Sequence, residues 1–304
     1  MELFRETHFD FVRWMKLSVT ISLIMLAAGM VSLVAKGGPR WSVDFRGGTV
    51  LQVRIKPAPP IAEVRRIIAG AGFTGAQVQD FGAADEFLLD IEQVAGIANA
   101  GQVAHQALVK GLPNATVELR REESVGPKVG GELRTAAANS VLASLILIIL
   151  YVGVRFVFRY GVAGVLALFH DVLTTLGLFS ILNKEISLSI IAAFLTIVGY
   201  SIMDSVVVFD RIRENMKMRR REGYAEVINM SINQTLSRTV LTSGLTLLTT
   251  ISLLLFGGPA IHDFAFALTF GVAVGTYSSI FIAAPILVWR QQRAGADKRR
   301  QPAM

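Results

Sequence analysis

Six long apolar stretches constrain the fold of this 304-residue chain more than any other feature. A helix needs about 20 mostly apolar residues to cross the hydrocarbon core of a bilayer, and 52% of the residues here are hydrophobic. We therefore predict a polytopic α-helical membrane protein. The six predicted transmembrane helices are residues 17–34, 136–154, 161–182, 186–209, 236–256 and 264–289.

The distribution of basic residues predicts the orientation of these helices. Lys and Arg gather before the first stretch, after the second, fourth and sixth, and in the C-terminal tail, whereas the two short loops on the other side hold only Lys184. Because cytoplasmic loops carry an excess of Lys and Arg, we expect both termini in the cytoplasm. The net charge of +7 then follows from topology, so we expect no nucleic-acid partner. The first stretch is long and has only a weak cleavage site, which favours an uncleaved anchor.

A polar segment interrupts the apolar pattern and predicts a separate external domain. Residues 36–134 alternate between strand-like and helix-like spacing in the order β-α-β-β-α-β, which is typical of a ferredoxin-like sandwich. We predict four regions in the chain. They are the N-terminus with the first helix (1–35), the extracytoplasmic ferredoxin-like domain (36–134), the remaining transmembrane helices (135–289) and a basic cytoplasmic tail (290–304).

The external domain offers no sign of catalytic chemistry. It has no metal-ligand spacing and no nucleophile constellation, and the whole chain lacks cysteine. His105 is alone in a predicted helix, and the glycines of "FRGGT" predict a turn or bulge beside a strand. We therefore expect no enzyme activity, no metal and no cofactor.

An aspartate lies within the fourth predicted helix, where a charged group is costly in free energy. Asp204 lies late in a stretch rich in Val and Ile, where a carboxylate costs on the order of 2–3 kcal/mol unless it is solvated, paired or protonated. Tyr200 and Ser201 precede it by one helical turn and Ser205 adjoins it, so these three residues are expected to form a polar patch around Asp204.

The fifth predicted helix carries an arginine and a broad hydroxyl face. Arg238 lies just inside it, and Thr239, Thr242 and Ser243 follow within the next two turns. Such a face is expected to meet a partner helix or a water-filled path rather than lipid. Asp204 and Arg238 come from helices of opposite direction at similar depth and could approach each other, although Arg238 alone could also extend to the inner membrane surface.

The third and sixth predicted helices also carry residues that are unusual in a membrane helix or favour helix packing. Asp171 lies near the middle of the third predicted helix, next to His170, and Gly271 and Gly275 form a small-residue seam in the sixth that favours close helix packing. Asp171 and Asp204 could each serve only to hold helices together. A carboxylic acid that gains and loses a proton as a guanidinium approaches and departs would instead form a proton relay of Asp204, Arg238 and Asp171.

Several motifs together resemble one known family. "VDFRGGT" with Asp44, Gly47 and Gly48, "HDV" in the third helix, "VGYSIMDSVVVFDRIREN" and "TLSRTVLTSG" are similar to the SecF family of bacterial protein-export membrane proteins. The order of one helix, an external domain and five helices also matches, and it looks like half of a resistance-nodulation-division transporter.

The resemblance implies a function and a set of partners. It implies an accessory subunit of the Sec translocase in the bacterial inner membrane that acts with SecD and the SecYEG channel on an exported, unfolded polypeptide. The energy would come from the proton gradient, and the family's intramembrane aspartate and arginine map onto Asp204 and Arg238, with Asp171 carried over less directly. A proton-coupled transporter of small molecules or lipids, and a non-conducting scaffold, remain the alternative functions.

Overall fold

The computed structural model describes residues 7–93, 97, 99–155 and 158–289, and the chain divides into two compact units. The first, here called the helical unit, comprises Met1–Pro39, Val141–Lys184 and Ser189–Met304. The second, here called the sheet unit, comprises Arg40–Ser140 and Glu185–Leu188. The predicted basic tail at 290–304 lies outside the described residues.

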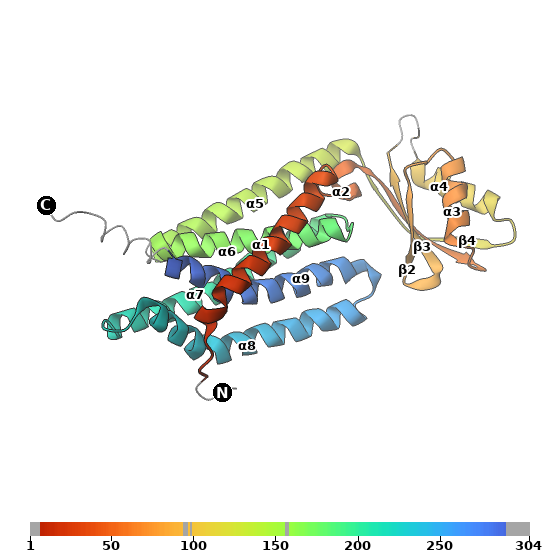
Figure 1. The fold of residues 1–304 in the computed structure, drawn as a ribbon. Helices are drawn as coiled ribbons and strands as arrows, with labels where there is room; N and C mark the ends of the chain where they lie inside the picture. Colours follow the sequence, from red (N-terminus) through yellow and green to blue (C-terminus); the bar gives the residue numbers. More distant parts are fainter. Residues whose placement is uncertain (1–6, 94–96, 98, 156–157, 290–304) are drawn as a thin grey trace. The chain divides into compact units, whose positions relative to one another are not determined.

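The described residues contain six helices long and apolar enough to cross a membrane (Figure 1). Three of them continue well beyond the predicted stretches, because a hydropathy pattern marks only the apolar part of a helix whose polar ends remain hydrogen-bonded. The helices are α1 (Phe11–Ala35), α5 (Pro127–Arg155), α6 (Phe158–Ile181), α7 (Leu188–Met218), α8 (Tyr224–Phe256) and α9 (Pro259–Ser278), the last followed by a π-helical turn, η1 (Ser279–Ala283).

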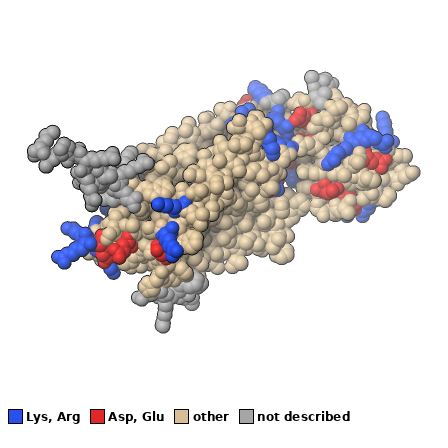
Figure 2. Space-filling model, viewed as in Figure 1, with Lys and Arg blue, Asp and Glu red and all other residues tan. Residues whose placement is uncertain are grey.

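Small residues allow the helices of the helical unit to approach closely. Gly29 of α1 and Gly177 of α6 face each other so closely that a Cβ added to Gly29 would lie 2.6 Å from the Gly177 Cα. By contrast, the apolar part of α5 is only 6% buried. On the face shown in Figure 2, charged side chains lie near both ends of the helices and leave their long middle part uncharged, as a hydrocarbon environment requires.

The sheet unit has the predicted ferredoxin-like fold. Its four strands are antiparallel in the order β2-β3-β1-β4, and its two larger helices pack on one face of the sheet (Figure 1). The elements are α2 (Val43–Arg46), β1 (Gly48–Lys56), α3 (Ile61–Gly70), β2 (Gln77–Phe81), β3 (Ala83–Glu92), α4 (Ala100–Gly111) and β4 (Thr116–Val125). The short helix α2 was not expected from the sequence.

The alternation of apolar and polar residues along β1 explains the core of the sheet unit. Leu51, Val53 and Ile55 are fully buried and meet Ile68 of α3 and Leu108 of α4 in a single apolar cluster. Burial of such a side chain contributes about 1.5–3 kcal/mol. The helices therefore stay on this face of the sheet.

Candidate functional site

Asp204 is part of a row of hydrogen bonds that crosses three membrane helices. Its side chain, in α7, is 7% exposed, and the Ser243 hydroxyl of α8 donates to its Oδ2 atom at 3.2 Å. The Thr276 hydroxyl of α9 in turn donates to the Ser243 oxygen at 2.8 Å. The buried carboxyl group thus has a hydroxyl partner on α8, which is itself bonded to a hydroxyl group on α9.

Asp171 forms the centre of a second polar cluster. It is fully buried in α6, and its Oδ2 atom accepts hydrogen bonds from Ser201 of α7 at 2.5 Å and from Ser278 of α9 at 2.8 Å. The Nδ1 atom of His170 lies 3.0 Å from Oδ1. Asp171 therefore joins three helices and has a titratable neighbour.

The glycine seam of α9, formed by Gly271 and Gly275, packs against α7. A Cβ added to Gly271 would lie 2.1 Å from the Ile197 Cδ1, and one added to Gly275 would lie 3.1 Å from the Ser201 Cβ. A Cβ at either position would make the side chain of Ile197 or Ser201 shift, so glycine favours this close packing.

Arg238 and Asp204 are not joined by an ion pair in the part of the chain that the structure describes. Arg238 is exposed on α8, whereas Thr239 is buried. Thr242 is also exposed, and its hydroxyl donates to the Arg238 carbonyl of its own helix at 3.0 Å. Among the described residues, Ser243 rather than Arg238 is thus the direct partner of the buried acid.

None of the three residues of the predicted polar patch forms a hydrogen bond with the Asp204 side chain among the described residues. Ser201 donates to Asp171 rather than to Asp204. The Tyr200 hydroxyl and the Ser205 Oγ are buried and have no hydrogen-bond partner among the described residues.

Sequence reasoning missed the α9 hydroxyl groups of Thr276 and Ser278. Both lie directly after the glycine seam, in "GTYSS", and this adjacency is the one signal that could have pointed to them.

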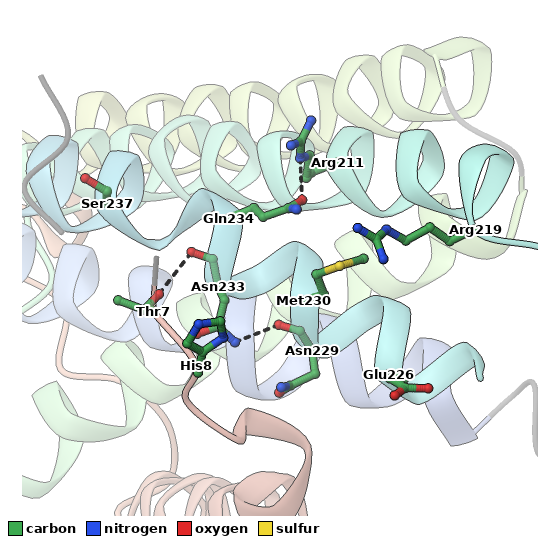
Figure 3. Close-up of a pocket in the computed structure, with 10 residues that line it drawn as sticks. All are labelled: Thr7, His8, Arg211, Arg219, Glu226, Asn229, Met230, Asn233, Gln234 and Ser237. Atoms are coloured by element: carbon green, nitrogen blue, oxygen red, sulfur yellow. Dashed lines mark hydrogen bonds between the residues drawn. The ribbon is translucent and has the colours of Figure 1, made fainter. Parts of the chain in front are cut away.

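A polar pocket of about 620 Å³ lies elsewhere in the helical unit (Figure 3). Asn229 and Asn233, one turn apart on α8, hold the chain that enters α1: the Phe9 N–H donates to Asn233 Oδ1 at 2.9 Å and the Phe11 N–H donates to Asn229 Oδ1 at 2.8 Å. Two arginines also line the pocket, Arg211 and Arg219, and each is paired with a glutamate three residues later.

Comparison with known proteins identifies the family. Residues 105–293 match the family described as "Protein export membrane protein SecD/SecF, C-terminal", and residues 31–59 match the "SecD/SecF GG Motif". The chain is 40% identical to the protein translocase subunit SecF of Gemmatimonas aurantiaca, over 96% of this chain and 90% of that protein. It is 44% identical to SecF of Magnetococcus marinus, over 95% and 94%. The chain belongs to the SecF family.

A longer relative named SecDF and two crystal structures of SecDF are also similar to this chain. The protein translocase subunit SecDF of Thermus thermophilus is 44% identical over 92% of this chain, which spans 38% of that protein. A crystal structure of SecDF, a translocon-associated membrane protein, superposes with a TM-score of 0.85 at 40% identity, covering 94% of this chain and 39% of that one. A second structure, of SecDF in a super-membrane-facing form, gives a TM-score of 0.72 and covers 98% and 41%.

The GG motif of the SecF family lies at the start of the sheet unit. Asp44 belongs to α2, and Gly47 and Gly48 join α2 to β1 with φ angles of 77° and 149°. A Cβ at Gly48 would lie 2.5 Å from the Ile91 carbonyl oxygen of β3. Both glycines therefore favour the positive φ angles, and Gly48 also permits the close approach of β1 to β3.

Proposed function

We propose that this SecF-family chain uses the proton gradient to promote export of polypeptides, with Asp204 as the group that takes up and releases the proton. The observation that carries the proposal is a buried carboxyl group in a membrane helix whose hydrogen-bond partner is a hydroxyl group rather than a cation. Hydroxyl groups can donate to a carboxylate or accept from a carboxylic acid, so both protonation states find partners at the same place.

The energy available suits a change of conformation. One proton that crosses about 100 mV delivers roughly 2.3 kcal/mol. A few kcal/mol are enough to shift a two-state population strongly. Asp171, whose partners Ser201 and Ser278 lie on α7 and α9, would respond to any movement of α7 that follows protonation of Asp204.

The partner in this proposal is a SecD protein. The Thermus relative carries the name SecDF, and this chain spans 38% of it. The exposed Arg238 and Thr242 of α8 and the little-buried α5 offer surfaces that such a partner would cover. The complex would act with the SecYEG channel on an unfolded polypeptide in the bacterial inner membrane, with both termini in the cytoplasm.

The test is Asp204→Asn in the assembled complex, reconstituted with the channel in vesicles. Asn keeps the size of the side chain but cannot carry a proton, so gradient-dependent export should be lost while ATP-dependent entry into the channel persists. Asp210→Asn is the matched control, because Asp210 is on the same helix but 39% exposed and paired with Arg155 at 2.7 Å. Normal gradient-dependent export by Asp204→Asn would reduce the chain to a scaffold, and loss of small-solute efflux instead would favour a transporter.

A further inference from the structure

The three residues before α7 and the first residue of α7 belong to the sheet unit rather than to the helical unit. Glu185–Leu188 lie far from residues 40–46 in sequence, yet the two segments are bonded through their backbones. The Ile186 N–H donates to the Arg40 carbonyl at 2.6 Å, and the Ser42 N–H donates to the Ile186 carbonyl at 3.0 Å. This makes a parallel bridge between Trp41 and Ile186. We call residues 40–46 together with Glu185–Leu188 the α7 anchor.

Asp44 binds the first residue of α7. Its Oδ2 atom accepts a hydrogen bond from the Leu188 N–H at 2.9 Å. The first N–H groups of a helix have no partner within the helix, and a carboxylate there also offsets the positive end of the helix dipole. The first turn of α7 has no acidic residue of its own. Asp44 therefore supplies from the GG motif the negative charge that the start of α7 lacks.

Ion pairs are also found in the rest of the anchor. Glu185 lies 3.1 Å from Arg40 and 3.5 Å from Arg46. Arg46 also lies 3.7 Å from Asp90 and is paired with Glu92, both in β3. Because Asp44 and Arg46 belong to the same short helix, the acid that binds α7 and the cation that binds the sheet are held on one element.

The backbone around α2 leaves it little freedom. Gly47 and Gly48 join it directly to β1, and a Cβ on Gly130 would lie 3.0 Å from the Gly47 nitrogen and 3.2 Å from the Phe45 carbonyl oxygen. Val43 and Phe45, on α2 itself, are buried. A displacement of the start of α7 would therefore act on the sheet rather than be absorbed in a loose connection.

The same helix carries Asp204. Leu188 and Asp204 are both in the continuous helix α7, about 24 Å apart at 1.5 Å per residue. We infer that Asp44 is a positioning residue that couples α7 to the sheet unit, so that movement of α7 on protonation of Asp204 is passed to the external domain. This inference rests on the function proposed above. It assigns to the GG motif the role of transmitting the movement of α7 to the external domain.

The experiment compares Asp44→Ala, Asp44→Asn and the control Asp80→Ala in the full complex. Asp80 is an exposed aspartate of β2. Asp44→Ala should slow gradient-dependent export by about threefold to tenfold, the range expected for loss of one helix cap, and should raise hydrogen exchange in the first turn of α7. Asp44→Asn can still accept the hydrogen bond from the Leu188 N–H. It should therefore recover part of the export rate and part of the protection of the first turn of α7 from hydrogen exchange. Asp80→Ala should change neither.

A disulfide distinguishes coupling from a loss of folding. The chain has no cysteine, so Trp41→Cys with Ile186→Cys introduces a single pair at the backbone bridge. In the Asp44→Ala background, oxidation of this pair should restore export and reduction should abolish the gain, with the amount of inserted protein unchanged. A protein that merely needs Asp44 for folding would not respond to oxidation after assembly.

The outcomes separate the two proposals. If Asp44→Ala frees the first turn of α7 while export stays normal, and Asp204→Asn still abolishes export, the coupling role is wrong and the proton role stands. If oxidation of the Cys pair fails to restore export in Asp44→Ala, the coupling role is also wrong. If Asp204→Asn exports normally, the proton role fails, and the coupling role fails with it.

Discussion

The hydroxyl group of Ser243 in α8 donates a hydrogen bond of 3.2 Å to Oδ2 of Asp204 in α7. This bond joins two membrane helices, and Thr276 extends the connection to α9. A change in the charge of Asp204 would therefore first alter its hydrogen bond with Ser243.

Ser243→Ala should weaken gradient-dependent export without abolishing it. Hydrogen bonds between membrane helices contribute about 0.6 kcal/mol on average and up to about 1.7 kcal/mol, which corresponds to a loss of roughly threefold to twentyfold in rate. Ser243→Thr keeps the hydroxyl group and should retain most of the activity. The measurement is the initial rate of export in vesicles with and without a proton gradient, and an equal loss in both conditions would contradict a role at Asp204.

Arg238 should require a positive charge but not a guanidinium. Because it is exposed on a membrane helix rather than paired with Asp204, Lys can place a cation near the same position, whereas Leu removes the charge. We expect Arg238→Lys to retain part of the export rate and Arg238→Leu to lose it. Arg220→Leu, in the exposed connection between α7 and α8, is the control. Equal rates in the Lys and Leu variants would indicate that Arg238 only anchors α8 at the membrane surface.

The fold could be predicted from the sequence because its signals are local. The period of two in β1 and the helical period of α3 each place their own apolar residues, such as Leu51 and Ile68, in the core. The motif that marks the SecF family likewise lies within short stretches of chain. The order of elements then follows from the sequence alone.

The partners within the site could not be predicted, because they depend on how helices are rotated against one another. Helical spacing places Ser201 on the face of Asp204, yet close packing at Gly275 turns Ser201 toward Asp171. Ser278 completes that cluster from α9, a helix whose neighbours no local pattern reveals. The bond from Leu188 to Asp44 joins residues too far apart in sequence for any periodicity to relate them.

Gly29→Ala should destabilise the helical unit. Its added Cβ would lie 2.6 Å from the Gly177 Cα, so backbone rather than a flexible side chain must move. Such overpacking costs about 1–3 kcal/mol. Gly244→Ala on α8 is the matched control, since a Cβ there meets nothing within 4 Å. Thermal unfolding in detergent should show a lower midpoint for Gly29→Ala alone, and equal midpoints for both variants would refute close α1–α6 contact.

The stability of the sheet unit should depend on pH through Glu185. Burial and the neighbouring Asp90 raise the pKa of Glu185 from its usual 4.5 to about 7, and Arg40 and Arg46 offset only part of this effect. Because the folded state holds the proton more tightly than the unfolded state, the contribution to stability is complete below about pH 4.5 and is lost as the pH rises through about 7. Burial also raises the pKa of Asp90, which acts in the same direction.

Glu185→Gln, which resembles the protonated form, should therefore match the wild type near pH 4.5 and be more stable near pH 8. Trp41 reports on the anchor once the other two tryptophans, Trp14 and Trp289, are replaced by Phe. Denaturant unfolding followed by its fluorescence at the two pH values gives the difference in the free energy of unfolding. Glu63→Gln, on α3, controls for the loss of a carboxylate elsewhere in the sheet unit. A variant less stable than the wild type at pH 8 would mean that the pairs with Arg40 and Arg46 outweigh burial, and would reverse the predicted sign.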